Sequence, residues 1–467
     1  MDQTTHIVQS INSLLWGMYG LIPLLVGTGL YFTFKLRFVQ IKRFVKAVKH
    51  VFGGITLFGR KADKDGMSSF QSLATAISAQ VGTGNLAGVA TAIAMGGPGA
   101  IFWMWLAAFF GMATIFSEAV LAQIYRTRDA HGNLTGGPAY YITLGMGEKW
   151  RPLAVFFSIA IIIALGCIGN MVQSNSIAHA METAFNVPAI VSGVVCAVLA
   201  GLVFFGGVGR LASVTEKIVP FMAAIYLIGG LWVIGAHIGE VIPAFKLIFV
   251  AAFDPEAVMG GALGLTVAKA MQFGVARGLF SNEAGMGSTP HAHAVARVEH
   301  PAEQGLVAMF GVFTTVVIVT FTGIVILVTG VLDFKTTGIE LTQHAYTVGL
   351  GSFGMAFVAV CLFFFAFSTI MGWYFFGEQN VRFLFRSRGV LAYRLIVCAF
   401  IVTGAMLKVD FVWSLADLFN GLMVLPNLVA LIALHKVVGA SLEDFERKLD
   451  HYEVKKSENI DDRMQRL

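Results

Sequence analysis

Long apolar runs alternate with short polar segments along almost the whole chain. Eleven of these runs are long enough to cross a hydrocarbon core of about 30 Å, a distance that takes roughly 20 residues of α-helix. They lie at 14–34, 68–94, 98–124, 152–180, 187–205, 213–235, 258–289, 303–332, 351–377, 391–407 and 412–435. The pattern predicts an all-α polytopic membrane protein with 11 transmembrane helices.

Two of these runs are interrupted. The chain reads SAQVGTGNLAGVATA at 78–92 and MQFGVARGLFSNEAGMGSTP at 271–290, so glycines and polar residues stand where a membrane helix is usually apolar. When the first run is set aside, each interrupted run is the first of a set of five. Because five is an odd number, the two sets cross the membrane in opposite directions. Glycine-interrupted segments at matching positions of inverted halves are typical of a transporter's binding site.

This arrangement predicts four parts of the chain. They are an N-terminal transmembrane helix with a basic loop (1–67), a first five-helix repeat (68–235), a second, inverted five-helix repeat (258–436) and a charged tail (437–467).

Composition and charge place these parts in a membrane. Hydrophobic residues make up 57% of the 467 residues and charged residues 13%, a balance that requires lipid around the fold. Of the 32 Lys and Arg residues, 26 lie in the tail from 436 and in the alternate loops 35–67, 125–151, 206–217, 290–302 and 378–390. The positive-inside rule therefore predicts an N-terminus outside and a cytoplasmic C-terminus in the cell (inner) membrane. The net charge of +5 reflects this topology and gives no case for a nucleic-acid partner.

Three structures are compatible with the stretch 78–92. A phosphate-binding loop needs G-x-G-x-x-G after a strand, whereas the spacing here is G-x-G-x-x-x-G inside an apolar run. A helix-packing face is compatible with the GxxxG pair Gly84 and Gly88. A helix broken inside the membrane exposes carbonyls to a cation and amides to a carboxylate, and Gln80, Thr83 and Asn85 add side-chain oxygens. The second interrupted run favours the broken helix, and with it a substrate and cation site.

Three motifs give the chain a resemblance to a known family. GTGNLAGVATAIAMGGPGAIFWMW at 82–105, GGPAYY at 136–141 and ARGLFSNEAGMGSTPHAHA at 276–294 are similar to motifs of the alanine/glycine:cation symporter family. The resemblance extends from the first apolar run to the last. It implies the leucine-transporter-type fold, with one helix before a 5+5 inverted repeat, and uptake of alanine or glycine coupled to sodium, or in some members to protons. We expect no enzyme activity, no cofactor besides sodium as the coupling ion, and a functional monomer in the lipid bilayer.

The resemblance also implies where the ligands bind. The substrate carboxylate is expected on backbone amides around Gly82, Thr83 and Gly84. The other substrate-binding residues implied are Gln80, Cys167, Asn170, Phe273, Gly274, Ala276, Thr369 and Trp373, with Phe273 and Trp373 closing an apolar box around a methyl group. Sodium is expected between carbonyls near Ser78 and Val81 and the hydroxyls of Ser368 and Thr369, with Asn85 at a second position.

Charged residues inside membrane spans are costly and are therefore candidates for function. Arg277 with Glu283 or Glu118 is interpreted as a candidate cytoplasmic gate, and a static structural pair is the alternative. A proton-coupled symporter with Glu118 or Glu283 as the titrating group is the nearest rival function. A gated channel is less favoured because the polar residues cluster at mid-depth. A membrane oxidoreductase is disfavoured because the sequence has no cofactor motif.

Overall fold

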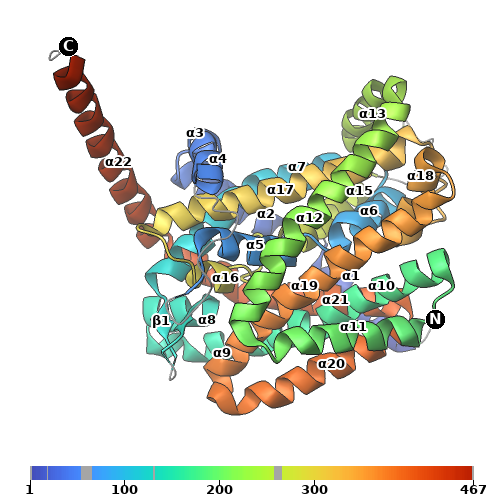
Figure 1. The fold of residues 1–467 in the computed structure, drawn as a ribbon, viewed down its shortest axis with the longest axis horizontal. Helices are drawn as coiled ribbons and strands as arrows, with labels where there is room; N and C mark the ends of the chain where they lie inside the picture. The colour runs from blue at the N-terminus through green and yellow to red at the C-terminus, as the bar shows by residue number, and fades with distance from the viewer. Residues whose placement is uncertain (1–2, 18, 54–65, 130–131, 257–265, 465–467) are drawn as a thin grey trace.

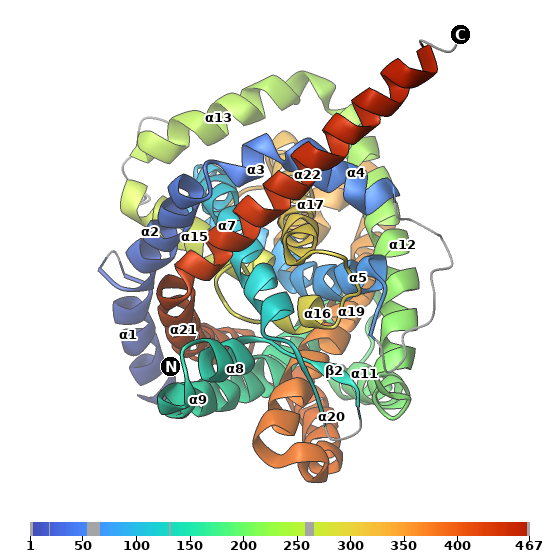
Figure 2. The same cartoon turned by 90° about the vertical axis from the view of Figure 1, so that its left-hand side faces the viewer.

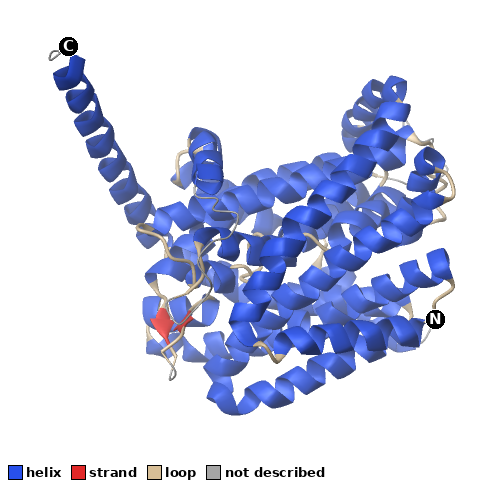
Figure 3. Ribbon diagram, viewed as in Figure 1, coloured by secondary structure: helices blue, strands red, loops and turns tan. Residues whose placement is uncertain are grey.

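The computed structural model describes residues 3–17, 19–53, 66–129, 132–256 and 266–464, and these are almost entirely helical (Figure 1 and Figure 3). One small antiparallel hairpin pairs β1 (Thr127–Arg128) with β2 (Leu134–Thr135). The all-α prediction is therefore confirmed for the described residues.

The helices of the first half follow the predicted runs with several subdivisions. They are α1 (Gln3–Leu15), α2 (Leu21–Lys35), α3 (Val39–Lys42), α4 (Phe44–Gly53), α5 (Ser69–Gln80), α6 (Val89–Gly96), α7 (Ala100–Ile124), α8 (Pro138–Tyr140), α9 (Arg151–Ile161), α10 (Asn170–Phe185), α11 (Ala189–Phe204) and α12 (Gly207–Ala236). A π-helical segment, Ile162–Gly169, joins α9 to α10 without a break.

The second half contains the longest helix, α19 (Phe353–Phe385). The helices of this half are α13 (Val241–Phe253), α15 (Val267–Asn282), α16 (Pro290–Ala294), α17 (Pro301–Val328), α18 (Gly338–Leu350), α19, α20 (Val390–Met406), α21 (Val409–Ala433) and α22 (His435–Met464). α13 and α18 lie in segments that the apolar pattern assigned to loops. Figure 1 shows them at the end of the molecule opposite the β-hairpin and α22.

Six helical stretches among the described residues are long and apolar enough to span a membrane. They are Ala100–Ile124, Glu148–Phe185, Gly207–Ala236, Pro301–Val328, Phe353–Met406 and Phe411–Ala433. The stretch Phe353–Met406 contains two of the predicted runs, and three shorter apolar helices coincide with further ones. The first predicted run, 14–34, is not one helix, because α1 and α2 are separate and α1 packs on α21.

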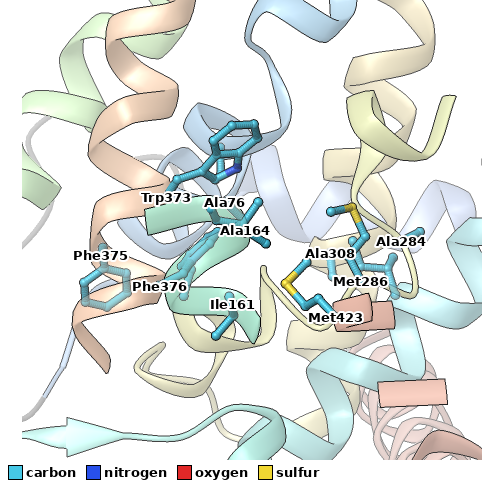
Figure 4. Packing of buried hydrophobic residues seen from close by; sticks show 14 of the residues in the cluster. Ala76, Ile161, Ala164, Ala284, Met286, Ala308, Trp373, Phe375, Phe376 and Met423 are labelled. Carbon is cyan, nitrogen blue, oxygen red and sulfur yellow. The ribbon is translucent and has the colours of Figure 1, made fainter. Parts of the chain in front are cut away.

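The two broken helices lie against each other at the centre of the bundle. α15 packs beside α6 and the π-helical turn that precedes it, and α16 packs beside α5. α7 runs next to them and also contacts α17 and α2. Figure 4 shows the apolar side chains that hold this region, with Ala76, Trp373 and Phe376 near Ala164 and with Met286 close to Met423. All of these residues belong to one buried cluster.

α22 leaves the bundle at the hairpin end (Figure 2). Its first turns are attached to the body by ion pairs, since Arg43 lies 2.8 Å from Glu446 and His300 lies 3.1 Å from Asp444. Hydrogen bonds from Lys448 and His300 hold the pKa of the Asp444 carboxyl below its ordinary value. The charged tail predicted from 437 is therefore helical, and ion pairs connect its first turns to other segments.

Candidate functional site at two helix breaks

The first break lies between α5 and α6. After α5 the chain leaves the α-helix and passes through a π-helical turn at Gly84–Gly88 before α6 begins. The N–H of Gly82 donates to Oδ1 of Asn85 at 3.1 Å, and the N–H of Thr83 donates to Oε1 of Gln173 on α10 at 3.2 Å. Side chains thus bond amides that an unbroken helix would bond internally, and the predicted broken helix is confirmed.

Several buried polar atoms at this break have no hydrogen-bond partner within the described part of the chain. They are Oε1 of Gln80, Oγ1 of Thr83 and Nε2 of Gln173, and Oδ1 of Asn170, one turn before Gln173 on α10, is also without a partner. Buried polar groups without partners are costly and rare in native proteins. Such a group of donors and acceptors fits a polar ligand.

The second break is longer and separates α15 from α16. Glu283 (φ +56°), Gly285 (φ +89°) and Gly287 (φ +77°) all adopt positive φ, a backbone region that favours glycine. Gly274, although it belongs to the interrupted run 271–290, lies inside α15 and not at the break. Gly274 instead permits close packing, since a Cβ there would lie 2.7 Å from Cβ of Trp103 on α7.

Two buried glutamates hold the second break. The Glu118 carboxylate on α7 accepts the N–H groups of Gly285 at 3.0 Å and Gly287 at 2.9 Å, and Nδ2 of Asn427 donates to it at 2.6 Å. Glu283 accepts from Nε1 of Trp373 at 2.6 Å and from the Ser288 hydroxyl. The Glu118 carboxylate therefore holds the unwound backbone at Gly285 and Gly287, and the Glu283 carboxylate holds Ser288 and Trp373.

Replacing Glu118 with glutamine should destabilise the fold. The new amide would present N–H groups toward backbone donors, and hydrogen bonds to a charged group contribute about 1.5–3 kcal/mol each. We expect the Glu118→Gln protein in detergent to melt several degrees below the wild type. Ser117→Ala is the matched control, because among the described residues the Ser117 hydroxyl bonds the Ala113 carbonyl of the same helix. Equal melting midpoints for Glu118→Gln and Ser117→Ala would contradict this role.

The two breaks are joined by direct contacts. Nε2 of Gln80 donates to the Asn282 carbonyl at 2.7 Å, and Nδ2 of Asn85 donates to the Ser281 hydroxyl at 2.8 Å. The absence of a side chain at Gly84 allows the close approach of α15, since a Cβ there would lie 2.9 Å from the Phe280 ring. The candidate site is thus one continuous region built from both halves of the chain.

α19 supplies hydroxyl groups to the first break. Oγ1 of Thr369 donates to the Ser78 carbonyl at 2.8 Å, and Oγ of Ser368 lies 3.5 Å from the same oxygen. Gly82 lies directly against Thr369. The structure therefore brings together three of the residues expected to hold sodium. Val81, a fourth residue expected to hold sodium, caps the C-terminus of α5. Asn85, expected at a second sodium position, forms hydrogen bonds with Gly82 and Ser281.

The predicted substrate residues fall into two groups. Gln80, Gly82, Thr83 and Gly84 lie at the first break, and Trp373 lies at the second through its bond to Glu283. Trp373 also packs on the helix that carries Asn170 and Cys167, because a Cβ on Gly169 would lie 2.6 Å from its ring. Nδ2 of Asn170 bonds the Gly166 carbonyl at 2.9 Å, and Cys167 is buried.

The second group lies elsewhere on α15. Phe273, Gly274 and Ala276 are six or more residues before the end of α15, which at 1.5 Å per residue is roughly 9–13 Å from the second break. Phe273 packs on Gly96 and lines a cavity at the α18 end. At the breaks, the aromatic partner of Trp373 is Phe280, with ring centroids 5.5 Å apart in an edge-to-face arrangement.

The expected pairing of Arg277 with a glutamate is wrong. Arg277 makes two hydrogen bonds to the Asp417 carboxylate on α21, at 2.7 and 2.8 Å, and its guanidinium lies 4.9 Å from the ring centroid of Trp413. These three side chains line a cavity of about 400 Å³ that also contains the start of α18. The pair therefore stands at the α18 end, away from the basic segments. A second cavity, of about 310 Å³, lies at the opposite end beside the β-hairpin, lined by Asp129 and Arg382 among others.

Sequence reasoning missed some residues of this site. Gln173 follows Asn170 by three positions and so shares a helix face with it, a spacing that indicated a second polar group. Asp417 is a charge inside the run 412–435, a signal of the same kind that singled out Arg277. Phe280 has no comparable signal, because apolar side chains are common in membrane helices. Asn427 is an amide inside the run 412–435, a signal of the kind that singled out Asn170.

Known proteins are similar in sequence to this chain over most of its length. Residues 1–459 match the sodium:alanine symporter family. The chain belongs to this family. Members of this family are membrane transporters. Three relatives align with nearly the whole chain.

Three relatives illustrate the range of the family. The sodium/alanine symporter AgcS of Methanococcus maripaludis is 42% identical over 94% of this chain and 96% of its own length. An uncharacterized transporter of Haemophilus influenzae is 46% identical over 96% of this chain and 98% of its own. Bacillus subtilis has a relative named "Probable sodium/glutamine symporter GlnT", 42% identical over 95% of this chain and 91% of its own. Family membership thus leaves the substrate open.

A solved structure also resembles the fold. The Eremococcus coleocola manganese transporter superposes with a TM-score of 0.50 at 13% identity, covering 80% of this chain and 78% of that chain. This likeness supports the helical fold alone and carries no information on the substrate.

Proposed function

We propose that the chain is a secondary active transporter that brings a small neutral amino acid, alanine or glycine, into the cell together with sodium. The observation that carries this proposal is the oxygen cluster beside the first break. There the Ser78 carbonyl lies within hydrogen-bond distance of the Thr369 hydroxyl and 3.5 Å from that of Ser368. Unwound carbonyls next to hydroxyl groups are the ligands that coordinate sodium in transporters with broken helices.

The substrate would bind between the two breaks. Its carboxylate would accept hydrogen bonds at Gly82 and Thr83, where Gln173 and Asn85 now occupy the amides. Phe280 and Trp373 would then enclose the side chain. The close contact of Trp373 with Gly169 leaves little room, which favours alanine and glycine over larger amino acids.

Transport would proceed by alternating access in a leucine-transporter-type fold with 11 spans, an N-terminus outside and a cytoplasmic C-terminus. One cavity at the α18 end and one at the hairpin end support two routes to a central site. The Arg277–Asp417 pair would close the outer route, and no covalent step is involved.

Proton coupling is the second candidate. Glu118 and Glu283 are fully buried, and neither lies in an ion pair with a described residue. A buried carboxylate without a cation is a candidate for protonation. Sodium-driven and proton-driven transport therefore need a direct comparison.

Uptake of radiolabelled L-alanine into proteoliposomes tests the proposal. We expect accumulation above equilibrium with an inward sodium gradient and none when potassium replaces sodium at constant pH. Accumulation that persists in potassium and is lost when a pH gradient is collapsed would assign coupling to protons instead. Competition by glycine, but not by glutamine, is expected from the small site, and effective competition by glutamine would contradict the proposed substrate.

A further inference from the structure

A third cavity with its own chemistry lies far from the helix breaks, where α22 begins. Its volume is about 550 Å³, and its lining residues come from the end of α2, from α3 and the residue after it, and from the first turns of α22. They include five basic side chains, Lys35, Arg37, Lys42, Arg43 and Lys436, and two acidic ones, Glu443 and Glu446.

The acidic side chains are already close to arginines. Glu446 accepts two hydrogen bonds from Arg43, at 2.8 and 3.2 Å, and Glu443 lies 3.9 Å from Arg37. The three lysines have no carboxylate within ion-pair distance among the described residues. The cavity thus has an excess of three positive charges, all on exposed side chains.

The cavity lies where two apolar helices end. α2 has no charged residue before Lys35, and α21 is followed by the polar helix α22. The rings of Tyr31 and His435 are in edge-to-face contact at 5.7 Å, so both helices end at the same level. Such a shared transition from apolar to charged residues marks the level of lipid headgroups.

An apolar surface continues from the cavity on the side of α2, α3 and α4. Phe34, Ile41 and Val45 are 65%, 59% and 66% exposed. Beside them, Leu36 and Val39 are buried and form the apolar wall of the cavity. A ligand with an anionic head and an apolar tail would meet both surfaces at once.

We propose that this cavity binds the phosphate headgroup of an anionic membrane lipid, with Lys35, Lys42 and Lys436 around the phosphate and the acyl chains along Phe34 and Ile41. Basic pockets between membrane helices on the cytoplasmic side bind such headgroups. The lipid would join the end of α2 to the start of α22, and its phosphate would provide the counter-charge for the three lysines. This site is independent of the transported substrate.

Native mass spectrometry of the full-length protein in detergent tests the site, with dioleoyl phosphatidylglycerol as the probe and dioleoyl phosphatidylcholine as the neutral comparison. Each basic residue near a membrane surface contributes about fivefold to binding of anionic lipid, so the triple variant Lys35→Gln, Lys42→Gln, Lys436→Gln should bind phosphatidylglycerol about 100-fold more weakly. The wild type should prefer phosphatidylglycerol over phosphatidylcholine.

The matched control replaces three exposed basic residues of other segments assigned to the same membrane side, Lys149→Gln, Arg386→Gln and Arg388→Gln. It should bind phosphatidylglycerol as the wild type does. Equal weakening in both triple variants, or equal binding of the two lipids by the wild type, would overturn the proposal. Displacement of the lipid by an equal concentration of inorganic phosphate would overturn the lipid as the source of the phosphate. Unchanged melting midpoints without added lipid show that both variants fold.

Discussion

Replacing Thr369 with valine is expected to raise the sodium requirement of uptake roughly 10- to 150-fold while leaving the fold intact. Valine has nearly the same shape as threonine but no hydroxyl, so the Ser78 carbonyl loses its 2.8 Å partner and the cation loses one oxygen ligand. Loss of a hydrogen bond or ligand to a charged group costs about 1.5–3 kcal/mol, which corresponds to roughly a 10- to 150-fold weaker binding of sodium. The measurement is the sodium concentration that gives half-maximal uptake of L-alanine.

Thr369→Ser is the matched control, because it keeps the oxygen and removes only a methyl group. It should retain uptake with at most a small change in the sodium requirement. If Thr369→Val and Thr369→Ser behave alike, the hydroxyl has no role in cation binding. A normal sodium requirement in Thr369→Val would point to the glutamates and to proton coupling.

Removing either partner of the Arg277–Asp417 pair is expected to lower uptake by at least about tenfold. The arginine side chain is 9% exposed and the aspartate 20%, and leaving one member of a mostly buried pair alone is strongly destabilising. If the pair closes the outer route, Arg277→Gln and Asp417→Asn should also impair retention of bound substrate. The measurement is the rate of L-alanine uptake in proteoliposomes for each variant and for the double variant.

The double variant separates a gate from two independent roles. Because the two side chains act on each other, its loss should be smaller than the product of the two single losses. The uptake rate of Arg277→Lys should fall between those of the wild type and Arg277→Gln, since lysine keeps the charge but cannot form the bidentate contact. Glu340→Gln is the control, because Glu340 lines the same cavity but is half exposed. Strictly multiplicative losses would contradict the gate.

The sequence predicts the first break better than the second, for a physical reason. At the first break, glycines and polar side chains occur together within a few residues, and the polar side chains favour an unwound helix over a packing face. The second interrupted run has four glycines with two different uses. Gly274 and Gly278 allow α15 to approach α7, whereas Gly285 and Gly287 permit positive φ. Packing and unwinding both require glycine, so sequence alone does not separate them.

The partner of Arg277 shows a second limit. A buried charge predicts that an opposite charge exists, but not which one, because a separation of 140 positions between Arg277 and Asp417 carries no distance information. Glu283 is the acidic residue nearest to Arg277 in the sequence. In the structure it faces Trp373 instead, because the chain turns sharply after Asn282.

The hydrogen bonds between the two breaks constrain how the protein can move. Gln80 and Asn85 stand on either side of the first break, and both hold the end of α15. Ser72 likewise bonds the Ala292 carbonyl of α16 at 2.8 Å. A rocking motion that carries these helices as a single rigid body keeps every one of these bonds, whereas separate swinging of either helix would break them in a nonpolar medium. In the proposed alternating-access cycle, the paired helices would therefore rotate together against the surrounding bundle, and the ligand would move with them.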